Sequence, residues 1–199
     1  MKKEKWGKFI VLYGINNLGK TTQAKLLVKN LRMNGFKAEY VKYPIYNLAP
    51  VGKLINDYLR RGNPYKFSPR EFQLLHFINK LNYEDFLKKK LTKGVNIVAE
   101  DYFGTTIAWG MGTGVDRKLL ESFYPFLFRE DAAFLFDGNR FIKSIEKNHK
   151  HETDDKLIRK VRKAHLMLGQ KYKWQKINAN LPIEVIQKII FNKVKKILK

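Results

Sequence analysis

The residues best suited to chemistry stand near the start of the chain, in the segment GINNLGKT. This segment, residues 14–21, fits the pattern G-x-x-x-x-G-K-[ST]. Its glycines let backbone N–H groups curl around phosphate oxygens, and Lys20 can reach the charge at the terminal phosphates. Thr21 offers a hydroxyl to Mg²⁺, and the helix that follows points its positive end at the anion. Because the pattern falls between an apolar strand and a helix, it predicts a site for the phosphates of a nucleotide.

The surroundings of this phosphate loop limit the class of protein. The loop opens the first strand–helix unit, and no guanine-recognising motif of the N-K-x-D type follows it. The chain is also too short for most motor ATPases. A nucleotide or nucleoside kinase is therefore the expected class, with a small acceptor for the terminal phosphate of ATP.

Apolar runs and helical spacing predict the elements that hold this loop in place. The expected strands are 8–13, 37–43, 95–99, 131–136 and 174–177. The expected helices are 21–34, 51–61, 69–92 and 182–198, together with the second half of 141–168. Ser68 caps the third of these helices, Pro69 takes its first position and Glu71 reaches back to the cap. Strands that alternate with helices predict a parallel sheet covered on both faces.

The composition fits one domain with a sizeable core in 199 residues. Cysteine is absent, which excludes disulfides, thiolate metal sites and a cysteine nucleophile. No run approaches the roughly 18 apolar residues of a membrane span. The apolar run from Phe9 to Tyr13 is too short for a signal core. We therefore expect a soluble, cytoplasmic protein with no membrane partner.

The charge allows two interpretations. Lys and Arg number 40 against 18 Asp and Glu, a formal net charge of +22. One interpretation is a surface for nucleic acid or an anionic membrane, and the other is a lysine-rich bias spread over solvated helix faces. The basic residues are scattered and are mostly lysine, as at Lys88 to Lys90, Lys143, Lys147, Lys150 and 193–199. We therefore do not expect nucleic acid to be a partner.

From the phosphate loop onward, the chain resembles the thymidylate kinases. FIVLYGINNLGKTTQ is similar to the opening of that family, whose loop usually reads E-G-x-D-x-x-G-K-[ST]-[ST]-Q. VNIVAEDYFGTTIAWG is similar to its strand and D-R-[YFH]-x-x-S-x-x-A-[YF] element. Further likenesses cover essentially the whole chain in order: KYPIYNLAPVGKLINDYL, FQLLHFINKLNYEDFLKKKLTKG and WQKINANLPIEVIQKI. The resemblance implies an α/β, P-loop NTPase-type fold of three layers with a five-stranded parallel sheet, as a single domain of residues 1–199.

The resemblance also implies roles for individual residues. The ATP phosphates would be held by Gly14, Asn16, Asn17, Leu18, Gly19, Lys20, Thr21 and Thr22. Catalysis would fall to Lys20, Glu100 and Asp101, and Mg²⁺ to Thr21 and Glu100. The acceptor would meet Pro44, Tyr46, His76, Lys80, Tyr102, Thr105 and Thr106. A basic lid at about 138–154 would cover the transferring phosphate, and the family is commonly homodimeric.

Four positions depart from the family pattern. Tyr13 and Asn16 stand where the loop usually has Glu and Asp, and Tyr46 and Asp101 replace two arginines that grip the acceptor's phosphate. Asp101 and Glu100 would repel a monophosphate unless a metal or a lysine intervenes. We therefore expect transfer to a nucleoside monophosphate such as dTMP, with a raised KM.

Other interpretations stay open at this stage. Without the two arginines the acceptor could be a deoxynucleoside, with Glu100 or Asp101 as general base for a sugar hydroxyl. The chain could also be a weakly active ATP-binding module with a basic surface for nucleic acid. The two acids can equally be ordinary carboxylates at a helix start. His76 and Lys80 share a helix face and could be a solvated pair, and Tyr102 could belong to the core.

Overall fold

Five parallel strands form the centre of the protein. The computed structural model describes residues 6–141 and 154–198. Its strands are β1 (Phe9–Tyr13), β2 (Ala38–Lys42), β3 (Asn96–Glu100), β4 (Ala132–Asp137) and β5 (Gln175–Asn178). They lie in the order β2-β3-β1-β4-β5. Every residue of β1 and of β3 is buried, which explains why β1 and the centre of β3 are apolar without alternation.

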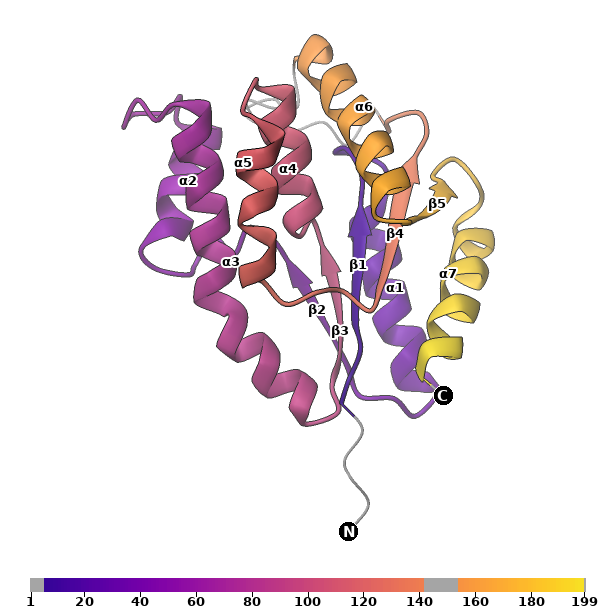
Figure 1. The fold of residues 1–199 in the computed structure, drawn as a ribbon. Coiled ribbons are helices and arrows are strands. Elements are labelled where there is room, and N and C mark those ends of the chain that lie inside the picture. The colour runs from indigo at the N-terminus through magenta and orange to yellow at the C-terminus, as the bar shows by residue number, and fades with distance from the viewer. Residues whose placement is uncertain (1–5, 142–153, 199) are drawn as a thin grey trace.

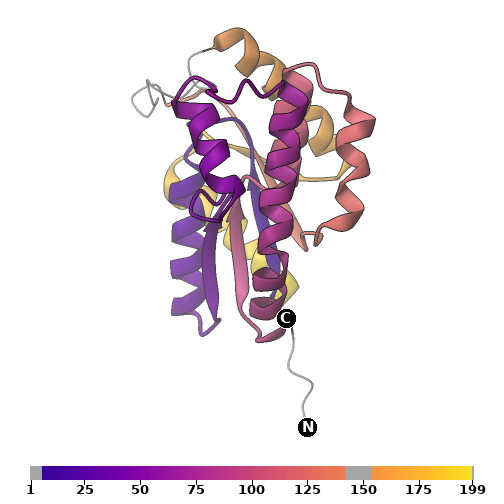
Figure 2. The ribbon, with the colours of Figure 1, turned by 90° about the vertical axis from the view of Figure 1, so that its left-hand side faces the viewer.

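Helices cover both faces of this sheet, which confirms the predicted three-layer α/β fold (Figures 1 and 2). One layer holds α1 and α7, and the opposite layer holds α3, α4, α5 and α6. The bounds are α1 (Lys20–Met33), α2 (Val51–Arg60), α3 (Pro69–Thr92), α4 (Phe103–Gly112), α5 (Arg117–Ser122), α6 (Asp155–Lys171) and α7 (Ile183–Leu198). A short 3₁₀ helix, η1 (Tyr124–Phe126), precedes β4. Among the described residues, no helix is both long enough and apolar enough to cross a membrane.

The expected strands and helices are all present, with ends that shift by a few residues at most. The structure adds α4, α5 and η1 between residues 103 and 126, whose bounds were not predicted from the sequence. The helical second half of 141–168 corresponds to α6. The predicted lid falls mostly within 142–153, outside the described residues.

The long helix α3 begins as the sequence predicts. The Ser68 hydroxyl accepts a hydrogen bond from the backbone N–H of Glu71, at 3.3 Å. The Glu71 carboxylate accepts in turn from the N–H of Ser68, at 2.7 Å. This reciprocal pair satisfies two donors that would otherwise lack partners and fixes where α3 starts. It thereby sets which residues of α3 face the carboxyl end of the sheet.

The loop after β2 is held by two contacts. The side-chain amide of the fully buried Asn79 bonds the backbone of Ile45 twice: Oδ1 accepts from the N–H at 2.8 Å, and Nδ2 donates to the carbonyl oxygen at 2.9 Å. In α2, a Cβ on Gly52 would lie 2.3 Å from the carbonyl oxygen of Tyr46, so only glycine permits this packing. The two contacts place Pro44 and Tyr46 beside the end of the sheet.

Candidate active site

The phosphate loop connects β1 to α1 through backbone conformations that need glycine. Gly14 has a φ of 136°, and a Cβ there would lie 2.5 Å from the carbonyl oxygen of Phe136. Asn17 and Gly19 also have positive φ values, of 63° and 76°. Residues of left-handed conformation interspersed in a tight loop turn backbone N–H groups inward, which makes a concave site for an anion.

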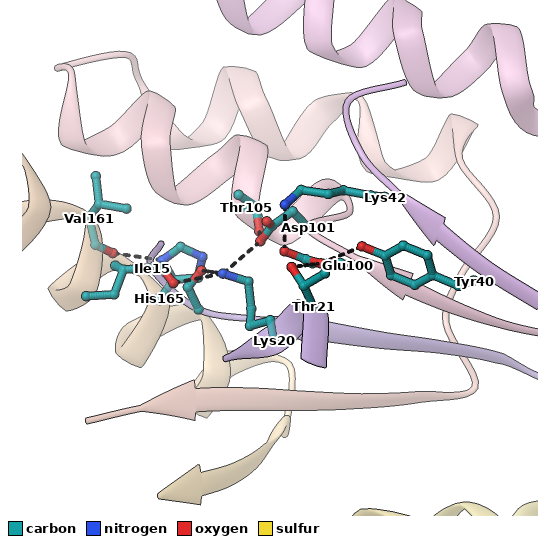
Figure 3. A network of polar contacts seen from close by, with 11 residues as sticks. Ile15, Lys20, Thr21, Tyr40, Lys42, Glu100, Asp101, Thr105, Val161 and His165 are labelled. Carbon is teal, nitrogen blue, oxygen red and sulfur yellow. Dashed lines mark hydrogen bonds and ion pairs between the residues drawn. The ribbon is translucent and has the colours of Figure 1, made fainter. Parts of the chain in front are cut away.

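Lys20 lies at the centre of the site with its ammonium group buried. Nζ donates to the carbonyl oxygens of Gly14 at 2.9 Å and of Ile15 at 2.8 Å. It also lies 3.5 Å from Oδ1 of Asp101. Figure 3 shows these contacts, with the buried imidazole of His165 beside the ammonium group of the lysine. Burial and the charge of Lys20 lower the pKa of His165 to about 3, so this imidazole is neutral near pH 7.

Glu100 is the last residue of β3, and its carboxylate contacts three groups of the site. Its Oε2 accepts from the hydroxyls of Thr21 and Tyr40, each at 2.7 Å. Its Oε1 lies 3.0 Å from Nζ of Lys42 (Figure 3). Burial alone would raise the pKa of Glu100, but Lys20 and Lys42 and the two hydroxyls hold it below the usual value. Glu100 is therefore a carboxylate at neutral pH.

Asp101 follows in a left-handed backbone conformation, with a φ of 61°. Besides Lys20, its Oδ1 accepts from the hydroxyl of Thr105 at 3.1 Å. Burial and the neighbouring Glu100 raise the pKa of Asp101, and Lys20 opposes them. Neither acid caps a helix, because Glu100 lies within β3 and the N-cap of α4 is Tyr102. Asp101 nevertheless directly precedes that N-cap and accepts from Thr105 in the first turn of α4, so it lies at a helix start and also contacts Lys20.

One cavity of about 420 Å³ joins the phosphate loop to the acceptor-side residues. Most predicted site residues line it: Asn16, Asn17, Leu18, Gly19, Lys20, Thr21, Thr22, Pro44, Tyr46, His76, Glu100, Asp101, Thr105 and Thr106. Gly14, Lys80 and Tyr102 do not belong to this lining. Gly14 begins the phosphate loop and packs against Phe136, whereas the side chains of Lys80 and Tyr102 are buried outside the cavity lining.

Lys80 and Tyr102 are buried, and both contact neighbouring residues instead of the cavity. Nζ of Lys80 donates to the carbonyl oxygen of His76 at 3.1 Å and to the Thr106 hydroxyl at 2.8 Å. Burial lowers the pKa of Lys80 to about 7, against the opposing charge of Asp101. The hydroxyl of Tyr102 donates to Glu84 at 2.8 Å, and burial raises its pKa. Lys80 thus orients the hydroxyl of Thr106, and its own ammonium group does not line the cavity.

The structure also brings in residues that the sequence analysis did not single out as site residues. Arg60, the last residue of α2, lines the cavity with its guanidinium 5.0 Å from the centre of the Tyr46 ring. Gln73 and Trp109 line it as well. Arg60 looks like a surface residue at a helix end, and Gln73 carries no motif, so only the packing of α2 on α3 reveals them.

Tyr13, which replaces an acidic residue of the family pattern, turns away from this cavity. Its ring stacks on Trp174 with centroids 4.0 Å apart, and its hydroxyl donates to Glu130 at 2.9 Å. Burial raises its pKa, so the phenol keeps its proton. The change at Tyr13 therefore alters the core beneath the site more than the cavity itself.

A glycine-rich phosphate loop after the central strand of a parallel sheet, with a lysine and two acids around it, defines a P-loop phosphotransferase. Residues 12–190 match the family model described as thymidylate kinase, and the chain belongs to that family.

The similarity to individual thymidylate kinases extends over most of this chain and most of theirs. A probable thymidylate kinase of Thermococcus kodakarensis is 29% identical over 204 residues, covering 96% of this chain and 98% of that protein. The thymidylate kinase of Plasmodium falciparum is 27% identical over 201 residues, covering 98% and 92%. The solved thymidylate kinase from Candida albicans superposes with a TM-score of 0.80 at 20% identity, over 96% of this chain and 92% of that one. This last likeness supports the fold.

Proposed function

We propose that this protein transfers the terminal phosphate of ATP to dTMP and forms dTDP. The observation that carries the proposal is the single cavity in which the phosphate loop and the acceptor-side residues meet. The family match favours a monophosphate acceptor over a free deoxynucleoside, and over an inactive ATP-binding module.

The residues present fit MgATP. The inward-turned loop and Lys20 provide donors for phosphate oxygens, with α1 directing its positive end at them. Thr21 and Glu100 are hard oxygen ligands that already contact each other at 2.7 Å, which is the donor chemistry that Mg²⁺ prefers. When bound there, Mg²⁺ would neutralise charge on the transferring phosphate. Lys20 would exchange its bonds to loop carbonyls for bonds to the nucleotide.

The reaction needs no base on the protein. An oxygen of the dTMP phosphate forms a bond to the terminal phosphorus of ATP, and the bond from that phosphorus to its bridging oxygen breaks, which releases ADP. The attacking oxygen is already ionised near neutral pH, so the site has to align two anions and balance their charge. Lys20 is the catalytic residue in this scheme, and Asp101 positions its ammonium group.

The acceptor's phosphate would be held by a substitute for the two missing arginines. Tyr46 stands at one arginine position, and Arg60 places its guanidinium over the same ring. At the other position, Lys42 pairs with Glu100 and Lys20 with Asp101, so each acid has a lysine whose charge offsets its repulsion of an incoming phosphate. These lysines are point charges without the bidentate fork of arginine. The substitution is therefore partial, and a raised KM for dTMP stays our prediction.

Assembly and location complete the proposal. Helix α3 exposes the apolar side chains Ile78, Leu81 and Phe86, which would suit contact with a second copy in a homodimer. We place the protein in the cytoplasm, where dTMP and ATP are available. Light scattering on the wild type and on Phe86→Glu tests the dimer, which the substitution should convert to monomer.

An acceptor panel tests the proposed reaction. ADP formation is followed with dTMP, with other nucleoside monophosphates and with free nucleosides. We expect dTMP to give the highest kcat/KM of the panel. Turnover of a nucleoside with none of dTMP would replace the proposal by a deoxynucleoside kinase.

A further inference from the structure

Gln73 is a buried amide that the mechanism has not used. Only 2% of it is exposed, and neither its Oε1 nor its Nε2 has a hydrogen-bond partner among the described residues. It nevertheless lines the cavity. A buried amide without a partner is unfavourable in a folded protein, so its polar atoms are expected to meet a ligand or water in the cavity.

The place of Gln73 in α3 indicates which part of a ligand it meets. His76 and Lys80 follow at three and seven residues, so the three side chains share one helix face. The Phe72 ring packs edge-on against the His76 ring, with centroids 4.7 Å apart. The phosphate-side charges come from other elements, namely Lys20 on α1, and Glu100 and Asp101 at the end of β3. The wall from α3 instead meets the cavity with Phe72, Gln73 and His76, two aromatic rings and an amide, which suits a flat base.

The stem of Gln73 is held in place by the facing helix. A Cβ on Gly110 of α4 would lie 3.1 Å from Cγ of Gln73, so the two helices are close at this point. Across the cavity wall, Lys80 donates to the Thr106 hydroxyl, which leaves that hydroxyl's own hydrogen free to donate. The carboxamide of Gln73, with its stem held by α4, thus offers a donor at Nε2 and an acceptor at Oε1 in one plane.

We propose that the Gln73 carboxamide recognises the acceptor's base by pairing with an N–H that stands beside a carbonyl, as N3–H and O4 do in thymine. Oε1 accepts from N3–H, and Nε2 donates to O4. This inference rests on the proposed function, because it assumes that the base end of dTMP lies against α3. It makes Gln73 a specificity-determining residue, while Lys20 keeps the chemistry.

The test measures binding, with Gln73→Met as the variant because methionine keeps the shape and removes both polar atoms. The probes are dTMP, dTMP methylated at N3, and 2-deoxyribose 5-phosphate, which has no base. Asn96→Leu is the matched control. Asn96 is a buried amide at the opposite end of β3 whose side chain bonds the backbone of Lys8 and Lys37, at 2.9 Å each.

Loss of two net hydrogen bonds should weaken dTMP binding by Gln73→Met about tenfold. Binding of 2-deoxyribose 5-phosphate should stay within about twofold, and the difference between wild type and variant should vanish with N3-methyl dTMP. The free Gln73→Met protein should melt at or above the wild-type temperature, whereas Asn96→Leu should melt lower and bind dTMP normally.

Two results would overturn the inference: dTMP binding unchanged in Gln73→Met, or an equal loss for dTMP and the base-free probe. If the wild type turns over dTMP and the variant binds it normally, this inference fails alone. If Gln73→Met weakens dTMP binding selectively but no dTDP forms with ATP, the proposed function fails and the base contact stands.

Discussion

At the scale of single residues, the charges of the site are arranged in neighbouring pairs. Lys20 lies 3.5 Å from Asp101, and Lys42 lies 3.0 Å from Glu100. Each acid lowers the repulsion between a lysine and its cationic neighbours, and each lysine shields an incoming phosphate from an acid. The cavity therefore accepts an anion although two carboxylates line it.

Asp101→Arg tests whether the missing arginine limits use of dTMP. One restored charge-assisted contact is worth about 1.5–3 kcal/mol, so KM for dTMP should fall by about tenfold or more. The measurement is a steady-state assay with dTMP varied at saturating ATP, with KM for ATP as the internal control. A wild type that already has a micromolar KM, with no improvement in the variant, would contradict the argument from the missing arginine.

The buried Lys80 predicts a pH-dependent stability. Its folded pKa of about 7 lies below the value of about 10.4 in an unfolded chain. Between these values the unfolded chain binds more protons than the folded chain, so the unfolding free energy rises with pH. Below about pH 7 the protein bears the full free-energy cost of burying the charged ammonium group of Lys80.

Lys80→Met removes that cost, so it should help more at low pH than at high pH. We expect the change in unfolding free energy upon substitution to be more favourable at about pH 6.5 than at about pH 9.5, measured by urea denaturation. Lys156→Met, on the exposed start of α6, is the control and should show no such difference. The same change at both pH values would mean that Lys80 keeps an ordinary pKa.

At the scale of elements, α3 begins at a capping box and also supplies residues on the acceptor side of the cavity. Ser68→Ala removes the N-cap and should lower the unfolding free energy by about 1 kcal/mol. Ser122→Ala is the control, since its exposed hydroxyl bonds the carbonyl oxygen of Leu119 and caps no helix start among the described residues. Chemical denaturation of both variants provides the comparison. An equal effect of the two substitutions would show that the cap does not anchor the helix.

Elements with local signals could be predicted from the sequence, and α4 could not. The buried strand β1 is an unbroken apolar run and β3 has an apolar centre, and caps or glycines mark the ends of several helices. Helix α4 contains three glycines and several β-branched or aromatic residues, which have low helix propensity. It forms because Gly104, Gly110 and Gly112 let it pack closely against Trp174, Leu120 and Val161. Such tertiary packing has no signature within the segment.

The site residues also divide into those that a local motif predicts and those that only tertiary packing brings in. The phosphate loop and the residues after β3 follow motifs of fixed spacing, and the structure gathers them around one cavity. Arg60 and Gln73 enter that cavity because α2 packs on α3 through Ile55, Tyr58 and Phe72. Neither residue belongs to a motif of fixed spacing, so the sequence alone does not connect them to the phosphate loop.

At the scale of the whole molecule, the charge of +22 raises the question of nucleic-acid binding. Scattered lysines give attraction without register, so binding to heparin or DNA should be weak and fall steeply with salt. We expect none that is measurable near physiological salt, by fluorescence anisotropy over a salt series. Sub-micromolar binding that resists salt would instead indicate a dedicated nucleic-acid surface.

The central claim is that this cavity moves a phosphate from ATP to dTMP with Lys20 at its centre. The most direct measurement incubates the protein with ATP labelled in the terminal phosphate and unlabelled dTMP, and separates the nucleotides. The wild type should produce labelled dTDP, and Lys20→Met should lose at least about a hundredfold in rate while circular dichroism shows a folded protein. Undiminished dTDP formation by folded Lys20→Met, or no labelled dTDP from the wild type, would contradict the account.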